Sequence, residues 1–365
     1  MTGRMAILVL TLLGAQQDAP AGAPAVRVEA PVYIPAGVSD PAGTLGCLRT
    51  PQGGVEAVDL ATGRSQWRVS PPARALLVSD GRAFVLEEGA GPRLRLAAYA
   101  ARTGKLNRAY DLAALGLPPW ASLADRGEGR EWTEFQVAGH LVGDRLEVGY
   151  DATRRRVSGF AGPSIVDRVQ GVARVDLDSG RVDLSPGPGP APPPLSEAML
   201  PAPGVRFVAV HARAPDATLM LAGPPANVAG ALVVGDRRLA FELSADSRVI
   251  VVHRWSAPGG EREPPLRLDH GQATDAVWAT IDRRHVLLRR AHDQRWYDLY
   301  SLETGRAILS LERPADVAVV GPRVYWTSLG TKGELVLTAT APTSGRRLWR
   351  RIVRNPDPPP GPPIP

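Results

Sequence analysis

Cysteine, lysine and aromatic residues are scarce in this sequence, and long apolar runs are missing. The 365-residue chain has one cysteine, Cys47, so it cannot form an intrachain disulfide, and its apolar setting favours a small buried residue. Aromatic residues make up 5% of the chain and hydrophobic residues 44%, which predicts a globular core built from Val, Leu and Ala. No run reaches the about 20 apolar residues of a membrane-spanning helix. We therefore expect no membrane span in the mature chain.

Positive charge comes almost entirely from arginine, because Lys105 and Lys332 are the only lysines among 43 basic residues. The formal net charge is +6 and the pI about 9.9, which favours an anionic partner. Most arginines, however, stand singly or in pairs beside Asp and Glu, and no aromatic-interleaved basic stripe accompanies them. The densest group is Arg154, Arg155 and Arg156. The pattern predicts a solvated basic surface and no nucleic-acid partner.

The first residues have the pattern of a secretory signal peptide. Arg4 supplies a positive end, Met5 to Leu13 an apolar run, and Gly14 and Ala15 the small residues of a cleavage site. We assign residues 1–15 to this signal, with cleavage as late as residue 23 also compatible with the sequence. No Cys follows the run, so a lipoprotein-type anchor is not expected. The predicted location is periplasmic or secreted.

Glycine and proline are abundant, at 38 and 36 residues, which suits many short strands joined by turns. The clearest unit spans Gly54 to Trp67 and reads as a strand, a tight turn and a second strand. In it, Asp59 and Thr62 can bond turn amides while Gly63 takes a positive φ. Ala57 keeps the facing position small, so that the ring of Trp67 can wedge against a neighbouring unit.

Weaker copies of this unit recur along the chain. The turn glycines of the first two copies, Gly63 and Gly104, are 41 residues apart, and those of the last two, Gly305 and Gly345, are 40 apart. Related turn and anchor residues in the copies are Thr103, Asp176, Gly180, Thr304 and Trp349. Elsewhere the anchor position holds Arg108, Leu184 or Leu309, which we expect to lose the aromatic wedge. A period near 40 with four short strands is typical of a propeller blade.

The sequence therefore predicts an all-β fold, a β-propeller of four-stranded antiparallel blades. Seven blades fit the count best, and six or eight are allowed, because residues 205–221 give only a doubtful unit. The predicted organisation is an N-terminal segment at 16–44, the propeller at 45–353 with a Pro-rich linker at 186–203, and a disordered Pro-rich tail at 354–365. An insertion from Ala152 to Gln170 should project from one rim. A monomer is expected.

The run from Ala57 to Trp67 resembles the tryptophan-docking repeat of propellers of the pyrroloquinoline quinone (PQQ) type, also called quinoprotein alcohol dehydrogenase-like. The match is full there and partial at the other turns. Two activities are known on this fold, those of quinoprotein dehydrogenases and of the cofactor-free propeller in the outer-membrane barrel-assembly machinery. The motif is structural in both, so the resemblance implies a fold and leaves function to a separate site. In character the chain is closer to the non-enzymatic members.

Candidate chemistry is sparse. A quinoprotein alcohol dehydrogenase would carry an adjacent Cys pair over its cofactor, which a single Cys excludes, whereas soluble sugar dehydrogenases lack that pair. Asp176, Asp178 and Gly180 resemble a fragment of a calcium loop but fit a structural turn better. The six histidines show no zinc-site spacing, and no phosphate loop or nucleophile elbow is present. Asp269 and His270 form a polar pair that could face a central channel.

From these observations we expect an exported, non-catalytic propeller without a cofactor, acting as a scaffold that binds a protein or polymer of the cell envelope. The alternative is a dehydrogenase of sugars or alcohols that uses PQQ and calcium. Candidate contact residues are Arg154, Arg155 and Arg156 in the insertion, and Asp269 and His270. Loops on a rigid ring are where such binding would lie.

Overall fold

All regular structure in the described residues is β-strand. The computed structural model describes residues 27–89, 94–112, 117–124, 127–128, 131–157, 163–187, 206–211, 232–234, 237–243, 249–256, 261–269, 276–281, 285–289, 296–312, 317–342 and 344–355. The strands within these ranges form six sheets, and every strand pair is antiparallel. The predicted all-β class is confirmed. In the same ranges, no helix of the length and apolarity needed to cross a bilayer occurs.

The first three sheets follow the chain to residue 187. Sheet I contains β2 (Val32–Ile34), β3 (Gly37–Ser39), β4 (Leu45–Arg49), β5 (Val55–Asp59) and β6 (Ser65–Val69). Sheet II contains β7 (Ala73–Ser79), β8 (Arg82–Glu88), β9 (Leu94–Ala100) and β10 (Leu106–Asp111). Sheet III contains β12 (Glu131–Val142), β13 (Arg145–Val157), β14 (Pro163–Asp176) and β15 (Val182–Pro186), with β1 (Val28–Glu29) and β11 (Gly127–Glu128) paired to β12.

The other three sheets follow in the second half of the chain. Sheet IV contains β17 (Leu232–Val234), β18 (Arg237–Leu243), β19 (Val249–Ser256) and β20 (Arg262–Asp269). Sheet V contains β21 (Ala276–Ile281), β22 (His285–Arg289), β23 (Trp296–Ser301) and β24 (Ala307–Glu312), with β16 (Arg206–His211) paired to β21. Sheet VI contains β25 (Val317–Val320), β26 (Arg323–Leu329), β27 (Leu335–Thr340) and β28 (Arg347–Arg354).

Three features of these sheets depart from the sequence-based boundaries. Sheet I begins at β2, inside the segment that we assigned to the N-terminus before residue 45. The described part of the doubtful unit at 205–221 is β16, which adds a fifth strand to sheet V and forms no sheet of its own. The predicted insertion at 152–170 continues β13 and β14 as paired strands. The signal peptide, linker residues 188–203, tail residues 356–365 and His270 lie outside the described residues.

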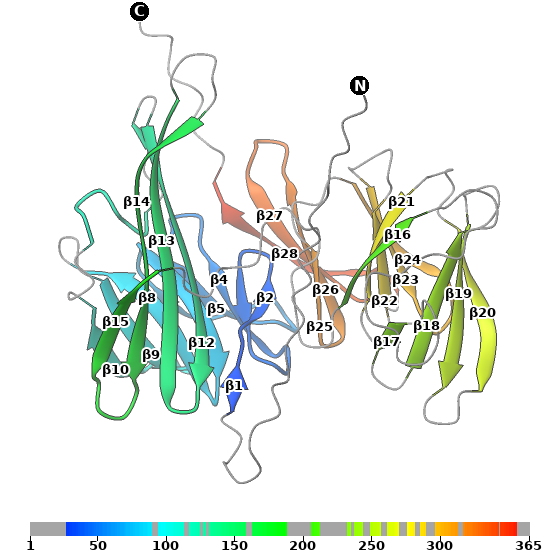
Figure 1. The fold of residues 1–365 in the computed structure, drawn as a ribbon, viewed down its shortest axis with the longest axis horizontal. Coiled ribbons are helices and arrows are strands. Elements are labelled where there is room, and N and C mark those ends of the chain that lie inside the picture. The colour runs from blue at the N-terminus through cyan, green and yellow to red at the C-terminus, as the bar shows by residue number, and fades with distance from the viewer. Residues whose placement is uncertain are drawn as a thin grey trace, which may run out of the picture.

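The sheets lie side by side in a row (Figure 1). Sheets III and II overlap on the left of the view, sheets I and VI lie side by side in the middle, and sheets V and IV lie on the right. Shared core clusters link the sheets in the order III, II, I, VI and V, so the C-terminal sheet VI packs on the N-terminal sheet I. The described residues thus show stacked antiparallel sheets without showing a closed ring. The predicted number of blades is correspondingly not settled by these six sheets.

The described turns before the outer strands β6, β10, β15, β24 and β28 share one local structure. Asp59 Oδ1 accepts the backbone N–H of Thr62 at 2.8 Å and its hydroxyl at 2.9 Å. Gly63 closes the turn with a φ of 71° and donates its N–H to the carbonyl of Asp59 at 2.8 Å. Asp176 repeats this arrangement with Ser179. At the other turn glycines, Gly104, Gly305 and Gly345, the same N–H to carbonyl bond is kept without an Asp.

The hydrophobic core is divided into clusters that lie between neighbouring sheets. One cluster joins sheets II and III through Phe84, Leu96, Leu146 and their neighbours. Separate clusters join sheets I and II, sheets I and VI, and sheets V and VI. Cys47 is fully buried in the cluster between sheets I and II, as the sequence predicts, and this burial raises the pKa of its thiol to about 12. Sheets I, II, III, V and VI therefore depend on their neighbours for a core.

Candidate interaction surface

At several junctions, the neighbouring sheet donates hydrogen bonds to one backbone carbonyl, which lies one residue after the last strand but one of a sheet. At the junction of sheets VI and I, Trp349 Nε1 donates to the carbonyl of Leu60 at 3.0 Å. The Trp349 ring also covers Gly63, where an added Cβ would come within 2.6 Å of Trp349 Cγ. At the junction of sheets I and II, Trp67 Nε1 donates to the carbonyl of Ala101 at 2.7 Å. The small turn residue thus makes room for a ring from the next sheet.

Arg108 takes the place of the tryptophan between sheets II and III. Its Nη1 donates to the carbonyls of Leu177 and Asp178 at 2.8 and 2.7 Å, and Tyr110 adds a bond to the Leu177 carbonyl at 2.9 Å. Leu177 follows Asp176, as Leu60 follows Asp59, so the acceptor is equivalent. The sequence predicts the loss of the aromatic wedge in this unit, and Arg108 supplies no ring. Its guanidinium nevertheless keeps the hydrogen bond to the equivalent carbonyl.

Sheet IV reaches sheet V through the equivalent carbonyl. Arg254, which is 8% exposed, donates from Nη1 to the carbonyl of Leu302 at 2.9 Å, while Leu266 lies over Gly305. In contrast, the anchor position of sheet III holds Leu184, which is 40% exposed. The motif residues therefore form junctions between sheets, and a binding function has to be sought elsewhere on the chain.

The most distinct feature outside the junctions is an extension of sheet III that we call the arm. It consists of residues 131–137 of β12, 150–157 of β13 and 163–170 of β14, and it rises beyond the other sheets (Figure 1). Its base is anchored by Phe135 and Ala152, which belong to the core shared with sheet II. The arm is therefore held on a packed sheet while its upper part lies in solvent.

Arg154 and Arg156 lie on one face of the arm with Glu131. In an antiparallel pair, directly opposed residues share a face, and Glu131 is opposite Arg156. Glu131 Oε2 accepts Arg154 Nε at 2.9 Å, and its other oxygen accepts Arg156 Nε at 2.5 Å. Hydrogen bonds from Arg156 and then Arg154 lower the pKa of Glu131. Asp167 is opposite Arg154 on the same face, so two cations face two anions.

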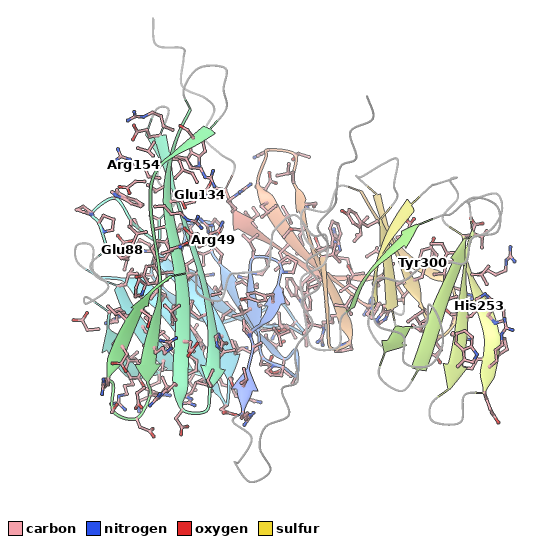
Figure 2. All side chains as sticks on the ribbon, viewed as in Figure 1. Arg49, Glu88, Glu134, Arg154, His253 and Tyr300 are labelled. Atoms are coloured by element: carbon pink, nitrogen blue, oxygen red, sulfur yellow. The ribbon has the colours of Figure 1, made fainter. Side chains whose placement is uncertain are left out.

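Arg155 lies on the other face, where it pairs with Glu134. Its Nε is 3.1 Å from Glu134 Oε2, and Figure 2 labels Glu134 and Arg154 on this part of the sheet. Arg168 pairs with Asp151 through two donors, of which Nε lies 3.1 Å from Oδ1. The Arg168 bonds lower the pKa of Asp151. This face also carries two cations and two anions, so the arm has no formal net charge.

The candidate contact residues that the sequence predicts lie on two different sheets and do not form one site. Arg154, Arg155 and Arg156 lie on the arm, already paired with carboxylates. Asp269 ends β20 in sheet IV, and its backbone carbonyl accepts the hydroxyl of Tyr300 at 2.6 Å. Tyr300 is labelled in Figure 2 on the neighbouring sheet V, so this contact joins two sheets. In the described ranges, no group of three or more His, Cys, Asp or Glu residues is placed to hold a metal ion.

Sequence reasoning missed the paired strands of the arm. The signal was present in the β-branched residues Thr153, Val157, Ile165, Val166 and Val169. The arginine run between them was interpreted only as part of an insertion that projects from one rim, because charged runs are usually solvated. Cross-strand partners such as Glu131 lie more than 20 residues away in the sequence, so neutralisation of that run is visible only once the register is known.

No protein-family model matches the chain, and no curated protein matches its sequence. Among solved structures it is similar to an uncharacterized protein from Listeria monocytogenes EGD-e, at 11% identity and a TM-score of 0.33, over 90% of this chain and 95% of that one. It is also similar to quinohemoprotein alcohol dehydrogenase from Comamonas testosteroni, at 11% identity and a TM-score of 0.23, over 85% of this chain and 58% of that one. Similarity at these levels is weak, and we base no functional argument on it.

Proposed function

We propose that this chain is an exported, non-catalytic binding scaffold in which the sheets are blades of a PQQ-type propeller and the arm presents a surface to a protein partner of the cell envelope. The observation that carries the proposal is the arm itself. It is a three-stranded extension that adds little to the core beyond its base, yet its charges are matched internally on both faces. Such an ordered projection on a packed sheet suits contact with another macromolecule.

The propeller requires that sheets III and IV meet and close the ring. Leu184 supports this step, because it occupies the position of Trp67 and Trp349 in its own sheet and yet is 40% exposed. Docking on sheet IV would cover it. Small-angle scattering tests the closure, since a compact chain of this length has a radius of gyration of about 21 Å and an open row has a larger one. A distinctly larger value, with an elongated distance distribution, would count against the ring.

The function is tested by capture and by cofactor addition on the same purified chain. The chain, immobilised through its C-terminus, should retain a specific envelope protein, and photo-crosslinks from the arm should identify its contact region. Adding PQQ with Ca²⁺ should give neither bound-cofactor absorbance nor dye-linked oxidation of sugars or alcohols. Turnover with PQQ and Ca²⁺ would replace the proposal with the dehydrogenase alternative, and crosslinks confined to regions other than the arm would remove the arm from it.

A further inference from the structure

Within the described strands, the outer edge of β14 has no strand partner over the length of the arm. β13 pairs with β14 from Pro163 to Asp176, whereas β15 pairs with it only from Gly171 to Val175. Among the described strands, none pairs with the outer side of residues 163–170. A strand edge of this kind presents unpaired backbone donors and acceptors, which are a template for another strand. Residues 164–170 span about 23 Å at the usual rise per residue.

The side chains on this edge are apolar where a partner strand would contact them. Ile165 and Val166 are 53% and 45% exposed, and they are the only two sequence neighbours among the large hydrophobic residues found exposed in the described part of the chain. Val166 is the extra residue of a β-bulge, since Asp167 and Ile165 oppose consecutive residues of β13. Two adjacent exposed β-branched residues on a free edge therefore favour contact with another strand.

The charges of the arm leave the backbone edge as its principal recognition element. All four arginines of the arm are bonded to its own carboxylates, so a highly charged polymer would have to displace these pairs. The carboxylate of Asp167 accepts the N–H of Arg168 at 2.9 Å, which caps one donor locally. The remaining edge suits main-chain hydrogen bonds to a bound strand, whose side chains would contact the two faces of the arm in alternation.

We propose that β14 binds an extended segment of a partner protein by strand addition along residues 164–170, with β-branched or aromatic side chains next to Ile165 and Val169. This deepens the proposed function, on which it rests, by naming the edge and the form of the partner. A second copy of this chain fits less well. Because pair types alternate in an antiparallel ladder, a two-fold axis passes through a residue pair. Pairing all of residues 164–170 with a second copy centres this axis on Asp167, which sets two like charges opposite each other.

The test uses a synthetic peptide, Lys-Thr-Val-Thr-Val-Thr-Lys with a fluorescent label, and the full chain. We expect saturable binding by fluorescence anisotropy and slower amide hydrogen exchange confined to residues 164–170. A matched peptide with every interior amide N-methylated keeps the side chains but loses the backbone donors of both edges, and it should not bind. Equal binding of the two peptides, or exchange protection elsewhere, would overturn strand addition to β14.

Two double variants distinguish binding at the β14 edge from non-specific binding to exposed apolar residues. I165K/V166K should weaken peptide binding by at least about tenfold, because edge lysines oppose strand pairing. The matched control L329K/I352K changes two other exposed apolar residues, at 67% and 50% exposure, and should leave binding unchanged. Equal losses in both variants would overturn the proposal, as would a concentration-dependent dimer abolished by I165K/V166K. If I165K/V166K still captures the envelope partner in full, this inference fails while the proposed function stands.

Discussion

Replacing Trp349 by Ala should uncouple the last sheet of the chain from the first. Trp349 is 9% exposed, and its Nε1 bond to the Leu60 carbonyl joins residues 289 positions apart. Truncation of a buried Trp to Ala costs about 3–5 kcal/mol, of which the lost hydrogen bond accounts for about 1 kcal/mol. The expected loss is therefore a large part of the 5–15 kcal/mol that is typical of a folded domain.

The assay is urea unfolding followed by far-UV circular dichroism, which does not depend on tryptophan emission. W349F keeps most of the ring contact with Gly63 and removes only the donor, so it should cost about 1–2 kcal/mol. The control is W132A on the arm, where Trp132 donates to Glu134 within sheet III, and it should cost under about 1 kcal/mol. A W349A protein within 1 kcal/mol of the wild type, or no less stable than W132A, would refute the reasoning that docking at this carbonyl holds sheets VI and I together.

Three further predictions follow from the junctions and turns. R108A should lower the free energy of unfolding by about 1.5–3 kcal/mol, because charge-assisted bonds to two carbonyls are lost. R108W should recover part of this loss, because its ring can dock on the next sheet. Equal instability of R108A and R108W in urea would contradict this prediction. Hydrogen bonds from Thr62 lower the pKa of Asp59. The stability that these bonds add is therefore complete above about pH 4 and is lost as the pH falls through the folded-state pKa. The melting temperature of D59N should accordingly fall less steeply below pH 4 than that of the wild type. Cys47 should react with a maleimide only at the rate of unfolding, because it is fully buried and the pKa of its thiol is raised to about 12. Fast labelling of the native chain would contradict this and would show that the core between sheets I and II opens locally.

The strands were predictable from sequence where a turn glycine and alternating apolar residues coincide. The turn glycines Gly104 and Gly305, for example, lie between the last two strands of sheets II and V, because turn chemistry acts over a few residues. The additions β1 and β16 were not predictable in this way. Each pairs with a strand over 60 residues away, at Val142 for β1 and at Ile281 for β16, and short strands carry almost no pattern of their own.

The position of the candidate surface was predictable from the sequence, but its chemistry was not. The run Arg154 to Arg156 correctly marked a segment that projects from a sheet (Figure 1), since a triplet of arginines does not fit a core. Its chemistry depended on Glu131 and Glu134, which the register of β12 and β13 brings opposite to it. The register decides whether these arginines are free to bind an anionic partner or are neutralised, which leaves the strand edge for binding. A single sequence does not show the register.

The acceptor carbonyl, rather than the aromatic ring, is the constant part of the described junctions that carry this hydrogen bond. Leu60, Ala101, Leu177 and Leu302 hold this position, and their carbonyls accept from two tryptophans and two arginines. Since the turn geometry fixes the direction of that carbonyl, the donor is free to vary as long as it is long and carries an N–H group. An aromatic search therefore finds only some of the junctions, which explains why the repeat looks degenerate in sequence while the stacking of sheets persists. By the same logic Leu184 and Leu309, whose side chains carry no donor, cannot make this hydrogen bond from the anchor positions of sheets III and V, and the arm rises from sheet III.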